Sequence, residues 1–176
     1  MIPKAGVRKV AILGTASSGK STLAGALAGR YQTLWVPEYL REFVDTAGRV
    51  PVAGDQFHIA ATQRAREDAA AQQASRYLFC DTTPLMTAVY SRHYFGGIDA
   101  QLERLASSHL QDYDITLVTA PDIPWVADGL QRESEAVSVT INRMLLDELA
   151  LRGIPYLSIS GDPAQRLYQV EQRLGF

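Results

Sequence analysis

The chain has 176 residues, of which 47% are hydrophobic and 20% are charged, and its formal net charge is -2. These values are typical of one soluble globular domain with an ordinary core. The near-neutral charge argues against a broad basic surface, so nucleic acid is not expected as the main partner. No apolar run approaches the roughly 20 residues that cross a membrane, and residues 1–6 lack the apolar stretch of a signal peptide. The single cysteine, Cys80, excludes an internal disulfide and favours a cytoplasmic protein in which it is a buried small residue.

A glycine-rich loop is the most informative stretch of the chain. Residues 14–21 read GTASSGKS, follow the apolar run 10–13 and precede a helix-compatible segment, which is the context of a phosphate-binding loop. Its glycines allow successive N–H groups to converge on phosphate oxygens, and the helix start adds the positive end of its dipole. We therefore expect a nucleoside triphosphate here, with Lys20 on the outer phosphates and the Ser21 hydroxyl on Mg²⁺. The residues expected to bind the nucleotide are Gly14, Ser17, Ser18, Gly19, Lys20, Ser21 and Thr22.

The rest of the chain alternates short apolar runs with helix-compatible segments. Strands are predicted at 7–13, 33–36, 77–80, 115–118 and 156–159. Helices are predicted at 19–30, 39–44, 55–75, 84–95, 99–109, 137–152 and after Asp162, with Asp55 and Asp162 as caps. The charged residues of the 55–75 helix, Arg64, Arg66, Glu67 and Asp68, are expected on a solvated face. Strands alternating with helices predict a parallel sheet covered on both faces, in a single domain over residues 1–176.

Acidic residues follow two of the predicted strands, at the edge where ligands bind in parallel sheets. Asp81 follows the third strand and can hold Mg²⁺ beside Ser21; alternatively, it caps the next helix. Glu38 follows the second strand, where a carboxylate can orient an acceptor hydroxyl and take its proton late in phosphoryl transfer. Alternatively, Glu38 is a structural acid at a helix start. Of Arg41 and Glu42, one turn further on, either one is a substrate ligand while the other is only a surface charge.

Residues 122–136 follow the fourth strand, show little periodicity and lie where phosphate-loop kinases carry a lid. Arg132 is the arginine expected to neutralise charge on the transferring phosphoryl group, the alternative being a solvated side chain. Trp125 either stacks on a substrate ring or anchors the lid. Further stacking candidates are Tyr39, Tyr90 and Tyr94. The histidines show no metal-ligand spacing and are assigned no catalytic role.

Taken in order, the segments GTASSGKST, PEYLREFVD, DTTPLMTAVY, TAPDIPWVADGLQR and IPYLSI resemble the ribosylnicotinamide kinase domain of the bacterial NadR proteins. The resemblance covers nearly the whole chain. It implies a P-loop NTPase fold similar to nucleoside and nucleotide kinases: a three-layer αβα sandwich whose five-stranded parallel sheet has the order 2-3-1-4-5. It also implies a kinase that uses ATP and Mg²⁺ to phosphorylate the 5′-hydroxyl of nicotinamide riboside, giving nicotinamide mononucleotide in NAD salvage. The expected catalytic residues are Lys20, Glu38 and Arg132, and those expected at the substrate are Glu38, Tyr39, Arg41, Asp81, Trp125 and Asp128.

Two positions depart from the family pattern. The family tends to have a second aspartate after the Asp-Thr pair, where this chain has Thr83, and its lid arginine directly follows Gly-Leu, where this chain has Gln131. The first departure leaves open another nucleoside, a nucleotide or a small metabolite as acceptor, and a regulatory ATPase with a protein partner is a further alternative. A GTPase is not expected, because the chain has no Asn-Lys-x-Asp motif. Full NadR proteins also carry an adenylyltransferase domain, for which we expect no room in 176 residues.

Overall fold

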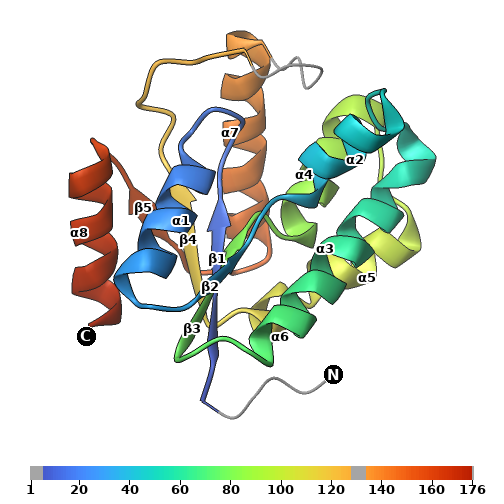
Figure 1. Cartoon of the computed structure of the whole chain (residues 1–176). Coiled ribbons are helices and arrows are strands. Elements are labelled where there is room, and N and C mark those ends of the chain that lie inside the picture. The colour runs from blue at the N-terminus through green and yellow to red at the C-terminus, as the bar shows by residue number, and fades with distance from the viewer. Residues whose placement is uncertain (1–5, 128–133, 176) are drawn as a thin grey trace.

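The computed structural model describes residues 6–127 and 134–175. These form one five-stranded sheet of parallel strands in the order β2-β3-β1-β4-β5, with helices on both faces (Figure 1). The strands are β1 Arg8–Leu13, β2 Leu34–Val36, β3 Tyr77–Asp81, β4 Ile115–Thr119 and β5 Leu157–Ile159. The helices are α1 Lys20–Arg30, α2 Tyr39–Ala47, the short 3₁₀ turn η1 Ala53–Asp55, α3 Gln56–Ala71, α4 Pro84–Phe95, α5 Ala100–Ser107, α6 His109–Asp112, α7 Glu135–Leu151 and α8 Pro163–Leu174. The predicted fold and strand order are confirmed, and no helix within the described ranges is long and apolar enough to cross a membrane.

The apolar sequence of β1 explains its central place in the sheet. Its residues Val10 to Leu13 are completely buried, as expected for a parallel strand covered on both faces. Successive side chains alternate between two cores: Val10 and Ile12 pack with α1 and α8, whereas Leu13 packs with α3, α4, α5 and α7. The result is three layers, with α1 and α8 on one face of the sheet and α3, α4, α5 and α7 on the other (Figure 1).

The two predicted helix caps have different outcomes. Asp162 accepts a hydrogen bond from the backbone N of Gln165 at 2.8 Å and caps α8, as expected. Asp55 makes no side-chain capping bond to α3. Its carboxylate instead accepts from the backbone N of Val52 at 2.8 Å and pairs with Arg49 at 2.7 Å. The prediction is wrong for the side chain because Asp55, although it directly precedes Gln56, ends the 3₁₀ turn and its carboxylate is held by Val52 and Arg49 of the preceding loop.

The predicted solvated face of α3 is wrong for Glu67, which is 0% exposed. Lys9 at the start of β1 lies with its Nζ 3.1 Å from Glu67 Oε2, and the Tyr113 hydroxyl donates to the same oxygen at 2.6 Å. Burial is the main cause that raises the pKa of Glu67. This ionic cluster lies at the amino ends of the strands, so it is at the opposite edge of the sheet from the glycine-rich loop.

Candidate functional site

The glycine-rich loop leaves the carboxyl end of β1 with a backbone bent by residues of positive φ. These angles are 152° at Gly14, 59° at Ser17 and 84° at Gly19. A Cβ at Gly14 would lie 2.3 Å from Thr119 Oγ1, so only glycine fits this position. Ser17 carries a side chain in the left-handed region, which costs on the order of 1 kcal/mol and is typical of ligand-binding turns. The loop therefore has the shape of a backbone cradle for an anion.

Two side chains brace the interior of this loop. Lys20 is buried, and its Nζ donates to the Thr15 carbonyl at 2.9 Å. Ser18 Oγ lies 2.7 Å from both the Thr15 carbonyl and Thr119 Oγ1, which ties the loop to the end of β4. The Lys20 ammonium is thus held across the loop, where it can meet a phosphate.

Ser21 and Asp81 are brought together from neighbouring strand ends. Ser21 Oγ donates to Asp81 Oδ2 at 2.6 Å. Asp81 is 1% exposed, and its other oxygen, Oδ1, is buried without a hydrogen-bond partner among the described residues. A buried carboxylate oxygen without a donor is costly, so it marks a place where a ligand belongs. Hydroxyl and carboxylate oxygens are the ligands that Mg²⁺ prefers, and this pair fits that ion.

The two threonines after Asp81 differ sharply in their environment. Thr82 has φ 76°, which is strained for a β-branched residue, and its Oγ1 is buried without a partner within the described chain. Thr83 is 0% exposed, and its Oγ1 lies 3.5 Å from Nδ1 of His109. The position at which the NadR pattern has a second aspartate is therefore part of the core. Nothing in the sequence pattern distinguishes the strained threonine from its neighbour.

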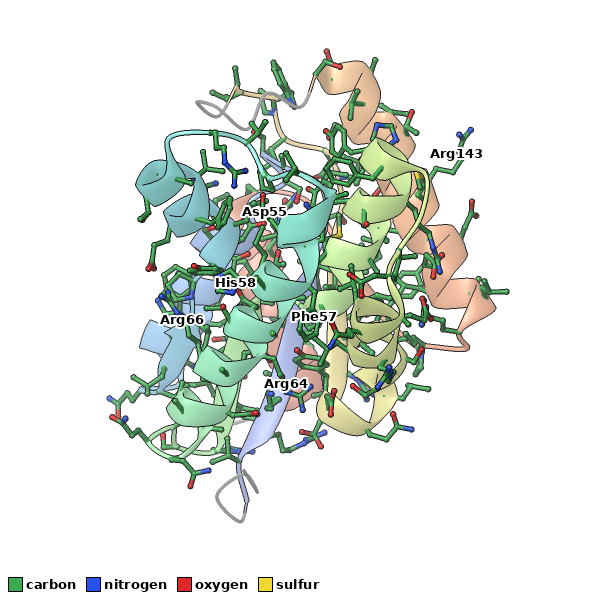
Figure 2. All side chains as sticks on the ribbon, turned by 90° about the vertical axis from the view of Figure 1, so that its right-hand side faces the viewer. Asp55, Phe57, His58, Arg64, Arg66 and Arg143 are labelled. Atoms are coloured by element: carbon green, nitrogen blue, oxygen red, sulfur yellow. The ribbon has the colours of Figure 1, made fainter. Side chains whose placement is uncertain are left out.

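The acceptor-side candidates lie at the start of α2. Glu38 is half-buried and immediately precedes this helix, but its side chain makes no capping hydrogen bond. The backbone N of Tyr39 donates to Gln63 Oε1 at 2.8 Å, and its hydroxyl lies 3.4 Å from His58 Nε2. Arg66 stands 4.7 Å above the Tyr39 ring. Figure 2 shows His58 and Arg66 projecting from α3 toward α2, so side chains of α3 hold the start of α2 in place.

Arg41 is exposed on α2, and the residue after it is paired with α3. Glu42 and Arg66 form two hydrogen bonds, at 2.5 and 2.8 Å. The bond to Arg66 is the main cause that lowers the pKa of Glu42. This pair was not foreseen in the sequence, where Arg66 was expected on a solvated face and Glu42 was either a substrate ligand or a surface charge.

Aromatic side chains occur on two further segments. Trp125 is half-buried, and its Nε1 is buried with no hydrogen-bond partner in the part of the chain that the structure describes. Ser17 Oγ donates to the carbonyl of Val126 at 2.5 Å, which places this segment against the glycine-rich loop.

Tyr90 and Tyr94 on α4 stack with ring centroids 6.2 Å apart. Asp128 and Arg132, expected in the lid, lie outside the described residues.

A cavity opens beside the glycine-rich loop, on the side of β4 and β5. It lies along the first turns of α1, between the segments that follow those two strands. Its lining residues are Gly19, Thr22, Leu23, Ala26, Ile123, Gly161, Pro163 and Arg166. Of these, only Gly19 and Thr22 were expected from the sequence to bind a ligand.

Arg166 of α8 joins the loops around this cavity and is 3% exposed. Its Nε donates to the Gly161 carbonyl at 2.9 Å, its Nη1 to the Ser18 carbonyl at 2.5 Å, and its Nη2 to the Ala120 carbonyl at 3.0 Å. It also pairs with Asp122. One guanidinium therefore fixes the segments after β1, β4 and β5 relative to one another. The sequence offered no signal for it beyond its place one turn into the last helix.

Comparison with known proteins decides the family. Residues 9–166 match the model of an AAA domain family. The chain belongs to this AAA domain family. It is also 33% identical over 147 residues to the trifunctional NAD biosynthesis/regulator protein NadR of Salmonella typhimurium, and equally to that of Escherichia coli. These matches cover 81% of this chain and 35% of each relative, so the chain spans about a third of their length. The resemblance to NadR inferred from the motifs is confirmed.

Solved structures agree on the fold. The crystal structure of NadR protein in complex with NR has a TM-score of 0.81 at 22% identity, covering 97% of this chain and 52% of that one. NadR in complex with NAD and AMP-PNP gives 0.75 at 20% identity, covering 97% and 50%. Deoxyadenosine kinase from M. mycoides gives 0.64 at 14% identity, covering 94% and 98%. At these identities the similarity supports the P-loop kinase-like fold.

Proposed function

We propose that this chain is an ATP- and Mg²⁺-dependent kinase that phosphorylates the 5′-hydroxyl of nicotinamide riboside and produces nicotinamide mononucleotide. The proposal treats residues 1–176 as one P-loop kinase domain with a lid at 122–136. It places the reaction in the cytoplasm, in line with the single buried cysteine. The acceptor is a small molecule, and neither nucleic acid nor a membrane is part of the reaction.

The observation that carries the proposal is the contact between Ser21 and Asp81. A serine after the loop lysine and a carboxylate from the neighbouring strand meet at 2.6 Å, and one carboxylate oxygen stays without a partner among the described residues. This is the arrangement that phosphoryl transfer needs beside a triphosphate. When bound there, Mg²⁺ would supply charge neutralisation on the phosphate oxygens.

In the proposed reaction each residue has one task. The backbone of residues 14–19 and the Lys20 ammonium hold the phosphates and stabilise negative charge on the transferring group. Glu38 orients the acceptor hydroxyl and takes its proton as the new phosphorus–oxygen bond forms and the bond to ADP breaks. Arg132 neutralises charge from the lid.

The acceptor is proposed to lie on the β2 and β3 side of the loop. The residues proposed to contact it are Glu38, Tyr39, Arg41, Asp81, Trp125 and Asp128. The relationship to NadR and the NR-bound NadR structure support a nicotinamide nucleoside. The presence of Thr83 where the family pattern has an aspartate does not oppose this. The side chain of Thr83 is buried and contacts His109, not the open edge of the sheet.

The deciding experiment measures ADP release with Mg-ATP, alone and with nicotinamide riboside. We expect a large increase with the nucleoside and a product with the mass of nicotinamide mononucleotide. Lys20→Ala serves as the inactive control, since it removes the phosphate-binding charge. If the folded protein binds ATP but leaves nicotinamide riboside unchanged, the acceptor is wrong, and a screen of other nucleosides, nucleotides and small metabolites follows. Turnover without any acceptor that a partner protein stimulates would instead favour a regulatory ATPase.

A further inference from the structure

The cavity beside the glycine-rich loop has the right place for the base of the phosphoryl donor. This inference rests on the proposed function, because it takes the triphosphate to lie in the loop. Of the acceptor-side residues, Glu38 follows β2 and Asp81 is the last residue of β3, both on one side of β1 in the sheet. The cavity lies on the other side, beneath the segments after β4 and β5. A nucleoside whose phosphates lie in the loop can therefore extend into this cavity, on the side of the sheet opposite to the acceptor.

Four backbone donors of the described segments around the cavity are already used inside the protein. A base edge carries acceptor atoms that an N–H group could recognise. The N–H groups after β4 and β5 bond instead to neighbouring protein oxygens: Ala120 to the Ile159 carbonyl at 2.8 Å, Ser160 to Gln169 Oε1 at 3.1 Å, Gly161 to Asp122 Oδ2 at 2.6 Å, and Asp162 to Gln165 Oε1 at 2.9 Å. None of these four donors is left to recognise a base.

The charged side chains at the cavity are committed in the same way. Arg166 uses four of its five N–H groups on the Gly161, Ser18 and Ala120 carbonyls and on Asp122. Asp122 accepts from Arg166 with one oxygen and from Gly161 with the other, so both of its carboxylate oxygens are already held by donors inside the protein. Among the described lining residues, the remaining side chains are apolar except for Thr22: Leu23, Ala26, Ile123 and Pro163.

Two of the walls come close together over Gly19. A Cβ added there would lie 3.0 Å from Nη1 of Arg166 and 3.0 Å from Cδ1 of Ile123. A planar guanidinium that is locked by hydrogen bonds offers a flat surface on which any base can stack. Ile123 offers an apolar contact, which likewise does not distinguish one base edge from another.

We propose that this cavity binds the donor base by stacking and apolar contact, with Arg166 as the residue that fixes its walls, so that purine and pyrimidine nucleoside triphosphates bind with similar affinity. The usual size of ligand discrimination supports this. A site that hydrogen-bonds its ligand rejects an analogue lacking the bonded group by about 10⁴-fold or more, whereas an apolar pocket discriminates between ligands by only about 10- to 200-fold.

The test is calorimetric titration of the whole chain with the Mg²⁺ complexes of ATP, GTP, CTP and UTP, and with Mg-tripolyphosphate as a probe without a base. We expect the four nucleotides to bind within about 100-fold of one another and all more tightly than tripolyphosphate. If one nucleotide binds more than about 100-fold more tightly than the rest, the base edge is recognised and the inference is wrong. Because no acceptor is present, this failure leaves the proposed kinase activity intact. Absence of binding by any triphosphate would instead overturn the proposed function itself.

Two variants test the walls. Arg166→Lys keeps the charge but removes the planar fork, and Ile123→Ala removes the apolar contact from a partly exposed position that folding tolerates. Since stacking contributes about 1–3 kcal/mol per base, we expect Arg166→Lys to weaken all four nucleotides by about tenfold or more and tripolyphosphate by less than about threefold. Ile123→Ala should give the same pattern, at about fivefold.

The matched control is Glu171→Gln. It removes the ion pair between Glu171 and Arg30 at 2.5 Å, which also links α1 to α8 but at the other end of α1. It should leave all five affinities unchanged. Equal losses for tripolyphosphate and the nucleotides would mean that Arg166 only supports the phosphate loop, and a loss restricted to one base would mean that it recognises an edge. Should Arg166→Lys not fold, Ile123→Ala decides, because unchanged or base-selective binding in that variant refutes the inference.

Discussion

Protonation of His109 is a quantitative test of how tightly the structure is packed behind the site. The side chain is 2% exposed, with Nε2 2.9 Å from Thr116 Oγ1 and its ring 4.6 Å from that of Tyr113. Burial is the main cause that lowers the pKa of His109 from 6.5 to about 4, because it penalises the charged imidazolium. The histidine is therefore neutral in the folded protein at pH values where it is charged in the unfolded chain.

The sign and size of the effect follow from this difference. Stability is fully present above the unfolded pKa of 6.5, and it is lost as pH falls toward the folded value of about 4, since only the unfolded state binds the proton in that window. One pKa unit corresponds to about 1.4 kcal/mol, so the full loss is about 3 kcal/mol. For a chain of this size it corresponds to a fall of about 6–12 °C in Tm.

The assay is urea denaturation of the wild type and of His109→Gln between pH 7 and pH 4.5. Glutamine keeps a hydrogen-bonding amide but does not titrate, and the carboxylates titrate equally in both proteins, so their contribution cancels in the difference. We expect the wild type to lose about 2 to 3 kcal/mol more than the variant across this range. Two stability curves that stay parallel would refute the reasoning and show that water or a rearranged loop reaches the imidazole.

Three further predictions concern named contacts. Glu67→Ala should lower the free energy of unfolding by about 3–5 kcal/mol, because it removes the buried carboxylate nearest the Lys9 ammonium and leaves only the partly exposed Asp68, 3.6 Å away. Combining Lys9→Met with Glu67→Leu should recover most of the loss, and urea denaturation checks both. Glu38→Gln should lower kcat about 10²–10⁴-fold without changing ATP affinity, measured by steady-state turnover and calorimetry, and full activity would remove Glu38 from the role of base. Asp81→Asn should reduce the gain in ATP affinity that Mg²⁺ provides by about tenfold or more, because a charged ligand is lost; titrations with and without Mg²⁺ check this, and an unchanged gain would contradict the metal role.

Much of the fold followed from local patterns. The strand positions could be predicted because buried parallel strands are continuous apolar runs, and β1 and β3 are of this kind. The meeting of Ser21 and Asp81 followed from topology, because the carboxyl ends of neighbouring parallel strands share an edge. The cap of α8 followed from Asp162 and Pro163, whose signals act within one turn.

The features that the sequence did not reveal depend on partners that are distant in the chain. Glu67 looks like any charged residue of a solvated helix until Lys9 and Tyr113 surround it. Arg166 takes its importance from Ser18 and Ala120, which no local periodicity connects to it. On the acceptor side, the roles predicted for Glu38, Tyr39 and Arg41 stay predictions.

The connections between strands differ in how they are held, and this divides the molecule into parts with different freedom to change. Residues 37–76 join β2 to β3 and residues 82–114 join β3 to β4, and they contain α2 to α6, which form most of one outer layer (Figure 1). The segments that directly follow β1, β4 and β5 are instead locked together by Arg166. Under the proposed function, new acceptors can therefore arise by exchange of whole helices between β2 and β4 while the residues proposed to hold the triphosphate stay the same. An exchange of residues 37–76 between relatives would move substrate preference as a module.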